Sequence, residues 1–221
     1  QHRSNGQKLV IKMSIKQQIV EDESKNLMEL CHPYIIKLYD IFEDEVNEYL
    51  VLEYCPNGSI QQKGKLPYNK FVHYSKQILE AIKFCHSKNI ALRDINPKNI
   101  YIDQYDQVKL TNFGMAKEFQ NDEISNEKCS SLMFLAPELF LNRDTCPFKT
   151  DIWALGVTFF YMATGSFPFK SSSIEKTKQM IERGEVNYSK YEIHPQIRFL
   201  ISRMSVEAEG MITTTLAMFL Q

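Results

Sequence analysis

Residues 91–114 read ALRDINPKNIYIDQYDQVKLTNFG, and this stretch decides the fold. It holds Arg93-Asp94, then Asn99 five residues after Asp94, and finally Asn112-Phe113-Gly114, where Asn112 comes thirteen residues after Asn99. The chain before this stretch mixes strand-like and helical patterns, whereas the chain after it is mainly helical. A motif with polar groups in a fixed order therefore links a mixed part of the chain to a helical part.

The first 54 residues predict three strands and one helix. Runs of the β type cover residues 7–15, 35–42 and 49–54. Between the first two runs, residues 17–30 show helical spacing, with one side formed by Ile19, Glu23, Leu27 and Leu30. Pro56-Asn57-Gly58 then breaks the pattern and is the best candidate for a boundary in the chain.

The rest of the chain predicts helices. Residues 67–87 carry apolar side chains at steps of three and four, as one buried helix face requires, at Phe71, Tyr74, Ile78, Ile82 and Cys85. A second helix is expected over residues 150–164, capped by Thr150 or Asp151 and stopped by Gly165. Further helices are expected over residues 172–183, 195–204 and 213–219. The pattern as a whole predicts a bilobal α+β arrangement, in which a small strand-plus-helix lobe joins a larger helical lobe near residue 55.

Composition excludes several classes of function. The 26 Lys and Arg residues nearly balance the 27 Asp and Glu residues, so neither a nucleic-acid partner nor a membrane surface is expected. The longest strongly apolar run, residues 152–163, is too short to span a bilayer and predicts a fully buried helix. The five cysteines are scattered without a Cys-x-x-Cys pair, which favours reduced thiols and an intracellular protein, cytoplasmic or nuclear. No signal peptide is seen, and Gln1 in place of Met favours a fragment or a processed product.

The motif of residues 91–114 closely resembles the catalytic loop and metal-binding turn of protein kinases of the Ser/Thr type, His-Arg-Asp-Leu-Lys-x-x-Asn and Asp-Phe-Gly. Other segments match that family in order and at near-family spacing, namely Val10-Ile11-Lys12, Ala136-Pro137-Glu138 and Asp151-Ile-Trp153-Ala-Leu-Gly156. The resemblance runs from about residue 2 to residue 220. It implies one protein-kinase domain, with residues 1–55 as an N-lobe that lacks the Gly-rich loop and residues 56–221 as the C-lobe. Residues 32–40 and 166–169 loosely resemble the calcium/calmodulin-dependent group.

The resemblance also assigns roles at a nucleotide site. Lys12 would contact the α- and β-phosphates and pair with Glu23. Leu52 would be the gatekeeper, backbone groups of Glu53 and Cys55 would face an adenine ring, and Tyr101 would lie under that ring. Asp94 would accept the proton of the substrate hydroxyl, while Asn99 and Asn112 would be the metal ligands. An alternative is that Lys12, Glu23 and Asp94 serve only as polar contacts that stabilise the fold, and that Tyr101 is ordinary core packing.

Three positions depart from the family's motif. Leu92 replaces His, Asn96 replaces the Lys that steadies the transferring phosphoryl group, and Asn112 replaces the Asp that holds Mg²⁺. Mg²⁺ is a hard cation usually held by carboxylates and phosphates, so the neutral amide of Asn112 is the most serious change. Tyr101 stands where the family usually has Leu, and its phenol could fill part of the nucleotide pocket.

These departures predict a pseudokinase or a strongly impaired Ser/Thr kinase that acts by binding a protein partner. One alternative is an active ATP-dependent Ser/Thr kinase, whose partner is a protein substrate and whose Gly-rich loop is missing from this chain. A second alternative is a nucleotide sensor without turnover. ATP and Mg²⁺ are the expected cofactors if any nucleotide binds at all.

A closed shape is also expected. The resemblance implies that Leu27, Leu92 and Phe113 form an apolar column between the lobes. Leu92 makes this column more apolar than the His of the family's motif would. The helix that carries Glu23 should therefore stay docked, with Lys12 and Glu23 at salt-bridge distance.

Overall fold

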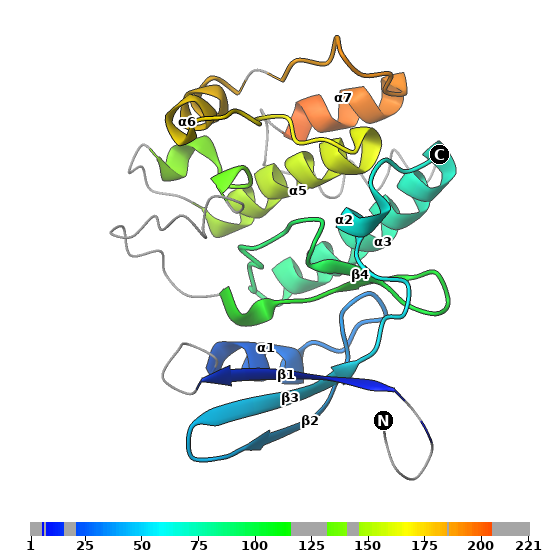
Figure 1. Ribbon diagram of the computed structural model, residues 1–221, viewed down its shortest axis with the longest axis vertical. Coiled ribbons are helices and arrows are strands. Elements are labelled where there is room, and N and C mark those ends of the chain that lie inside the picture. Colours follow the sequence, from blue (N-terminus) through cyan, green and yellow to red (C-terminus); the bar gives the residue numbers. More distant parts are fainter. Residues whose placement is uncertain are drawn as a thin grey trace.

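A small antiparallel sheet and a larger helical lobe make up the computed structural model (Figure 1). The structure describes Gly6 and residues 8–15, 21–115, 132–140, 146–184 and 186–204. The helix expected over residues 213–219 lies outside these ranges. The α+β architecture predicted from the sequence is confirmed, with strands concentrated in the small lobe and a mainly helical large lobe.

The small lobe is a three-stranded sheet with the order β1-β3-β2. Its strands are β1 (Leu9–Ile15), β2 (Leu38–Glu43) and β3 (Asn47–Glu53). In the antiparallel register, Lys12 of β1 lies opposite Leu50, and Val10 lies opposite Leu52. The second strand begins later than the pattern predicted, because Ile35 instead forms an isolated parallel bridge with Leu110 of the large lobe. That bridge ties the two lobes together behind the sheet.

Helix α1 (Glu21–Glu29) lies between the sheet and the large lobe (Figure 1). Its inner face buries Glu23, Leu27 and the adjoining Leu30, which are three of the four positions placed on one side by the sequence pattern. The helix contacts both β2 and the short 3-10 helix η1 (Phe113–Met115). Helix α1 is therefore held from both lobes.

The large lobe is built on α3 (Tyr68–Ser87) and α5 (Pro147–Thr164), which pack together. The expected face of α3 is buried, and so are all thirteen residues of α5 from Asp151 to Ala163. Around them lie α2 (Ile60–Lys63), the 3-10 helix η3 (Pro137–Leu139), α6 (Ile174–Arg183) and α7 (Pro195–Met204). Within the described ranges, no helix combines the length and the apolar character that crossing a bilayer requires.

The predicted cap of α5 is wrong. The helix begins three residues earlier than expected, at Pro147, which suits a first helical position because its missing N–H needs no acceptor there. Thr150 instead donates its hydroxyl to the carbonyl of Pro147, and Asp151 turns inward to a different set of donors. The predicted end is confirmed, since Gly165 adopts a left-handed conformation with φ 73°.

A two-stranded hairpin of the large lobe contributes to the site. Strands β4 (Ile100–Ile102) and β5 (Val108–Leu110) pair antiparallel and follow directly on the motif residue Asn99. Asp106 in the turn has φ 63°, and its carboxylate accepts hydrogen bonds from Lys70 and Tyr74 of α3. The hairpin is thus fixed to the longest helix and presents both ends of the motif to the small lobe.

Candidate active site

A cleft of about 550 Å³ lies between the small sheet and the β4–β5 hairpin. Eight of the nine residues that the sequence predicted for the site line this cleft: Lys12, Glu23, Leu52, Glu53, Cys55, Asn99, Tyr101 and Asn112. The ninth, Asp94, lies directly behind it, because its carboxylate accepts hydrogen bonds from Asn99 and Asn112. The fold therefore brings together residues that are up to 100 positions apart in the chain.

Lys12 joins the small lobe to the large one. Its ammonium lies 2.6 Å from the Glu23 carboxylate, whose side chain is 5% exposed. The same ammonium donates to Oδ1 of Asn112 at 3.2 Å. Gly114 leaves room for this arrangement, since a Cβ there would come within 3.2 Å of the Glu23 carboxylate. The expected pairing of Lys12 with Glu23 is confirmed.

The carboxylate of Asp94 accepts hydrogen bonds from three amide groups. Oδ1 accepts from Nδ2 of Asn96 at 2.7 Å, and Oδ2 accepts from Nδ2 of Asn99 at 2.7 Å and from Nδ2 of Asn112 at 2.6 Å. Asn96 and Asn99 also donate to the Asp94 backbone carbonyl, each at 3.1 Å. Three neutral amides therefore surround the Asp94 carboxylate.

Burial raises the pKa of Asp94 above its ordinary value, and the amide hydrogen bonds only partly oppose that effect. A neighbouring cation, Lys98, also lowers the pKa, but it contributes less than the three amides. Asp94 is therefore a stronger base than an exposed aspartate, although both of its oxygens are occupied by donors.

The backbone of the motif is anchored from below by Asp151. This fully buried residue of α5 accepts from the N–H groups of Leu92 at 2.8 Å and Arg93 at 2.7 Å, and its Oδ2 lies 2.8 Å from Nε2 of His86. The anchored loop includes Arg93, whose φ of 59° is uncommon for a residue other than Gly, Asn or Asp. Such a conformation persists where surrounding contacts hold it. The loop is thus fixed before any ligand binds.

Asn96 plays a part that the sequence analysis missed. Only 1% of it is exposed, and its Oδ1 accepts from the N–H groups of Lys98 at 3.1 Å and Asn99 at 3.2 Å while its Nδ2 reaches Asp94. The sequence showed only the loss of a Lys at this position. The signal that could have revealed the role is the spacing Asn-x-x-Asn after an Asp, because Asn side chains readily hydrogen-bond backbone groups two and three residues on.

The far end of the cleft is less polar. Leu52 is 7% exposed, and Tyr101 is 37% exposed and contributes to the wall of the cleft. Tyr101 is therefore neither packed into the core nor closing the cleft. Glu53 pairs with Lys109 at 3.1 Å. Burial is the main reason that the pKa of the Cys55 thiol is raised to about 12.

The expected apolar column is buried in one core cluster that contains Leu27, Leu92 and Phe113. Phe113 is 2% exposed and is not among the residues that line the cleft. Its carbonyl accepts from the Asn26 amide of α1 at 3.2 Å. Helix α1 is thus docked on the turn that follows Asn112, as the closed shape requires.

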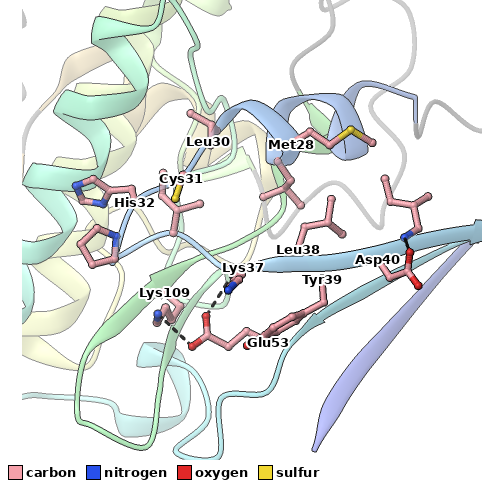
Figure 2. A pocket seen from close by; sticks show the side chains of 14 residues that line it. Met28, Leu30, Cys31, His32, Lys37, Leu38, Tyr39, Asp40, Glu53 and Lys109 are labelled. Carbon is pink, nitrogen blue, oxygen red and sulfur yellow. Dashed lines mark hydrogen bonds and ion pairs between the residues drawn. The ribbon is translucent and has the colours of Figure 1, made fainter. Parts of the chain in front are cut away.

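A larger hollow, of about 810 Å³, lies between α1 and β2, outside the predicted site (Figure 2). Its walls are mainly apolar and include Leu27, Leu30, Leu38 and Ile41. The Glu53 carboxylate, which lies between Lys37 and Lys109 in Figure 2, accepts from the backbone N–H of Lys37 at 3.3 Å. The ammonium of Lys37 lies over the Tyr39 ring, 5.0 Å from its centroid. The Glu53 carboxylate and the Lys37 ammonium therefore already have partners in this hollow. The predicted site residues line the smaller cleft instead.

The donor set does not fit Mg²⁺. Asn99 and Asn112 offer only neutral amide oxygens, and Oδ1 of Asn112 already accepts from Lys12. Across the part of the chain that the structure describes, no group of three or more His, Cys, Asp or Glu side chains could hold a metal ion. Mg²⁺ usually binds through one or two carboxylates together with phosphates, and each carboxylate that the described residues contribute to the cleft lining already has a partner.

Comparisons with known proteins place the chain in a family. The family model described as protein kinase domain matches residues 1–219. Sperm motility kinase 2B of Mus musculus is 33% identical over 220 residues, which cover 96% of this chain and 43% of that protein. The probable serine/threonine-protein kinase HSL1 of Saccharomyces cerevisiae is 31% identical over 88% of this chain and 13% of its own length. Calcium-dependent protein kinase 6 of Plasmodium berghei is 37% identical over 82% of this chain and 13% of its own length. The chain spans less than half the length of these relatives.

Proposed function

The chain belongs to the protein kinase family, and from that premise we propose that it is a pseudokinase or a strongly impaired Ser/Thr kinase that acts by binding a protein partner. The single observation that carries the proposal is the state of Asp94. Both of its carboxylate oxygens accept hydrogen bonds from asparagine amides. A base must be within hydrogen-bond reach of the proton it abstracts, so a substrate hydroxyl would have to share the carboxylate with these three donors.

The charge at the site argues in the same direction. Phosphoryl transfer depends on positioning and on neutralising the charge that develops on the phosphate. Asn112 and Asn96 are both uncharged where the family's motif has a carboxylate and a cation. Loss of such electrostatic stabilisation commonly lowers a rate by roughly 10²–10³. Among the described residues that line the cleft, Lys12 is the cation, and it is paired with Glu23.

The docked α1 supports a role in binding. The Lys12–Glu23 pair and the Asn26–Phe113 hydrogen bond hold the helix in place by contacts within the chain itself. A shape that needs no nucleotide is suited to a protein that presents a surface. The partner in this proposal is a protein, and the place of action is inside the cell, in the cytoplasm or the nucleus.

A second candidate function is an active Ser/Thr protein kinase with ATP and Mg²⁺ as cofactors. It is favoured by the retained Lys12–Glu23 pair at 2.6 Å and by the kinase names of the relatives. In this alternative Asn99 would be a ligand of the metal, and Asp94 would be released from its amide donors when substrate binds.

Phosphotransfer from radiolabelled ATP to a panel of generic Ser/Thr peptides distinguishes the two candidates. We expect no incorporation above that of the Asp94→Ala variant, in the presence or absence of Mg²⁺. A cooperative melting transition in each sample would show that both are folded. Robust turnover that Asp94→Ala abolishes would sink the pseudokinase proposal and leave the active kinase.

A further inference from the structure

The outer face of the small sheet, on the side away from α1, is apolar. Figure 1 shows α1 and the large lobe on the same side of this sheet. Successive residues of a strand point to opposite faces, so Met13 lies on the face opposite to Lys12, which reaches Glu23 of α1. The register places five apolar residues together on this outer face: Met13 and Ile15 of β1, Phe42 of β2, and Tyr49 and Val51 of β3.

These outer side chains form one exposed surface. Met13, Ile15 and Phe42 are all exposed, and the exposed Ile11 continues the row along β1 to the rim of the cleft. The rings of Phe42 and Tyr49 stack with their centroids 4.8 Å apart, which joins the side chains of β2 and β3. The solvated face of an antiparallel sheet ordinarily carries polar residues. A continuous exposed apolar face instead indicates an interaction surface.

The two ends of the outer face carry opposite charges. At one end, the last residue of β2 and the turn that follows hold three exposed acidic residues, Glu43, Asp44 and Glu45. At the other end, just before β1 and β2 begin, the exposed Lys8 and Lys37 lie over aromatic rings. A cation over a ring keeps its charge, so both ammonium groups can still meet a carboxylate.

This charge pattern is self-complementary in one orientation. Two copies that pack face to face by a closed contact are related by a two-fold axis between the two sheets. An axis along the strands would bring the two acidic turns together. An axis across the strands reverses their direction and places each acidic turn over the Lys8 and Lys37 end of the other copy. Glu53 at that end does not oppose the contact, because it is already paired with Lys109.

We propose that the outer face is a self-association surface, through which two copies of this chain pack sheet on sheet with their strands in reversed directions. The inference goes beyond the proposed function, since Asp94 and Asn112 take no part and the occupant is a second copy. Three strands spaced about 4.8 Å apart and seven residues long give a flat area of roughly 300 Å². A standard interface covers about 800 Å² on each partner, so the dimer is weak, with a Kd in the micromolar range.

Sedimentation equilibrium of the unmodified chain, from low to high micromolar concentration, tests the proposal. We expect the mass to rise from one chain toward two as the concentration increases. High salt should weaken the dimer, because it screens the charged groups at the two ends of the face. A mass of one chain at every concentration would overturn the proposal, and a dimer that high salt leaves unchanged would overturn the reversed packing.

Two methionines provide a matched pair of variants. Met13 of the outer face is 63% exposed, and Met28 of α1 is 67% exposed, so a Glu at either position is compatible with the fold. Met13→Glu should weaken the dimer at least about tenfold, because a carboxylate would be buried against an apolar face. Met28→Glu should associate like the unmodified chain, and both variants should keep a cooperative melting transition. Unchanged association of Met13→Glu, or loss of association in Met28→Glu, would overturn the assignment to the outer face.

Charge reversal tests the orientation of the two copies. Lys37→Glu and Glu45→Lys should each weaken the dimer roughly tenfold, because each variant places like charges together at both ends of the two-fold contact. A one-to-one mixture of the two variants should associate as tightly as the unmodified chain, since acid again meets base between the copies. A mixture that associates no better than its components would refute the reversed packing.

The phosphotransfer assay is independent of these measurements. Neither Lys37 nor Glu45 lines the cleft. Turnover by the unmodified chain would defeat the pseudokinase proposal and leave the dimer, whereas a chain that stays single at every concentration would defeat the dimer and leave the pseudokinase proposal.

Discussion

Replacement of Asn112 by Asp restores the residue of the family's motif. It tests whether the Asn112 amide contributes to the stability of the domain. Asn112 donates to Oδ2 of Asp94 at 2.6 Å and accepts from Lys12 at 3.2 Å. The change converts the donor into a second carboxylate oxygen that faces the first. It leaves the contact with Lys12 as an ion pair.

The expected decrease in the free energy of unfolding has two unfavourable contributions and one favourable contribution. Two unit charges about 4 Å apart repel by about 4 kcal/mol at the effective dielectric constant of ~20 that suits sites in proteins. A hydrogen bond to a charged group, worth about 1.5–3 kcal/mol, is also lost. The ion pair between the new carboxylate and Lys12 stabilises the folded variant by up to about 1 kcal/mol. Since the carboxyl pair can also retain a proton, we expect a net loss of about 2–4 kcal/mol at pH 7 without metal.

The destabilisation caused by Asn112→Asp should decrease as the pH falls. Repulsion raises the folded-state pKa of the carboxyl pair above the unfolded value, so the folded variant binds more protons than the unfolded chain. The destabilisation is therefore largest above the raised pKa and is relieved as the pH falls toward the unfolded pKa. Between these two pKa values, each decrease of one pH unit restores about 1.4 kcal/mol of the free energy of unfolding. Mg²⁺ should also restore stability, because a ligand that binds only the folded state stabilises it.

Urea unfolding followed by circular dichroism measures these effects at pH 7 and pH 5, each with and without Mg²⁺. Asn89→Asp is the matched control, because it introduces the same carboxylate at an exposed residue with a similar backbone angle. That control should stay within about 0.5 kcal/mol of the unmodified chain. The reasoning is refuted if Asn112→Asp is as stable as the control, or if its loss depends on neither pH nor Mg²⁺.

Three further predictions follow from buried polar groups. Asp151→Ala leaves two backbone N–H groups and one imidazole without their acceptor, so the free energy of unfolding should fall by about 3 kcal/mol or more. A fall of less than about 1 kcal/mol in urea unfolding would contradict the anchoring role of Asp151. Lys12→Met leaves the Glu23 carboxylate buried without its ion pair and should cost about 1–3 kcal/mol, part of which Glu23→Gln in the same chain should restore; strictly additive losses in the double-mutant cycle would mean that the pair is not coupled. Because burial raises the pKa of Cys55 to about 12, iodoacetamide at pH 8 should modify it at least about tenfold more slowly than the exposed Cys31 in peptide mass spectra; urea should abolish the difference, and equal rates in the folded protein would contradict it.

Much of the fold follows from patterns that are local in the sequence. The face of α3 was predicted from apolar residues at steps of three and four, and each of those residues is buried. The end of α5 at Gly165 was predicted because a glycine there can adopt a positive φ. Such features depend on residues close together in the chain, so a single sequence contains the information that fixes them.

The start of α5 shows where local patterns mislead. Thr150 and Asp151 are both good capping residues, and the sequence gives no reason to reject them. The structure uses Asp151 to hold the backbone of Leu92 and Arg93, more than fifty residues earlier in the chain. A long-range contact of this kind outweighs a cap that contributes about 1 kcal/mol.

Sequence alone determined which groups are present around Asp94: the acid itself, amides at positions 96, 99 and 112, and a cation at position 12. Only the tertiary structure decided how the amides are oriented. The Nδ2 atoms of Asn96, Asn99 and Asn112 all point to Asp94, and Oδ1 of Asn112 is left for Lys12. An amide can present either its donor or its acceptor in a given direction, and the choice depends on which charged group lies within about 3 Å of each end. For Oδ1 of Asn112 and Lys12, that distance is set by the packing of two lobes, which no short stretch of sequence encodes.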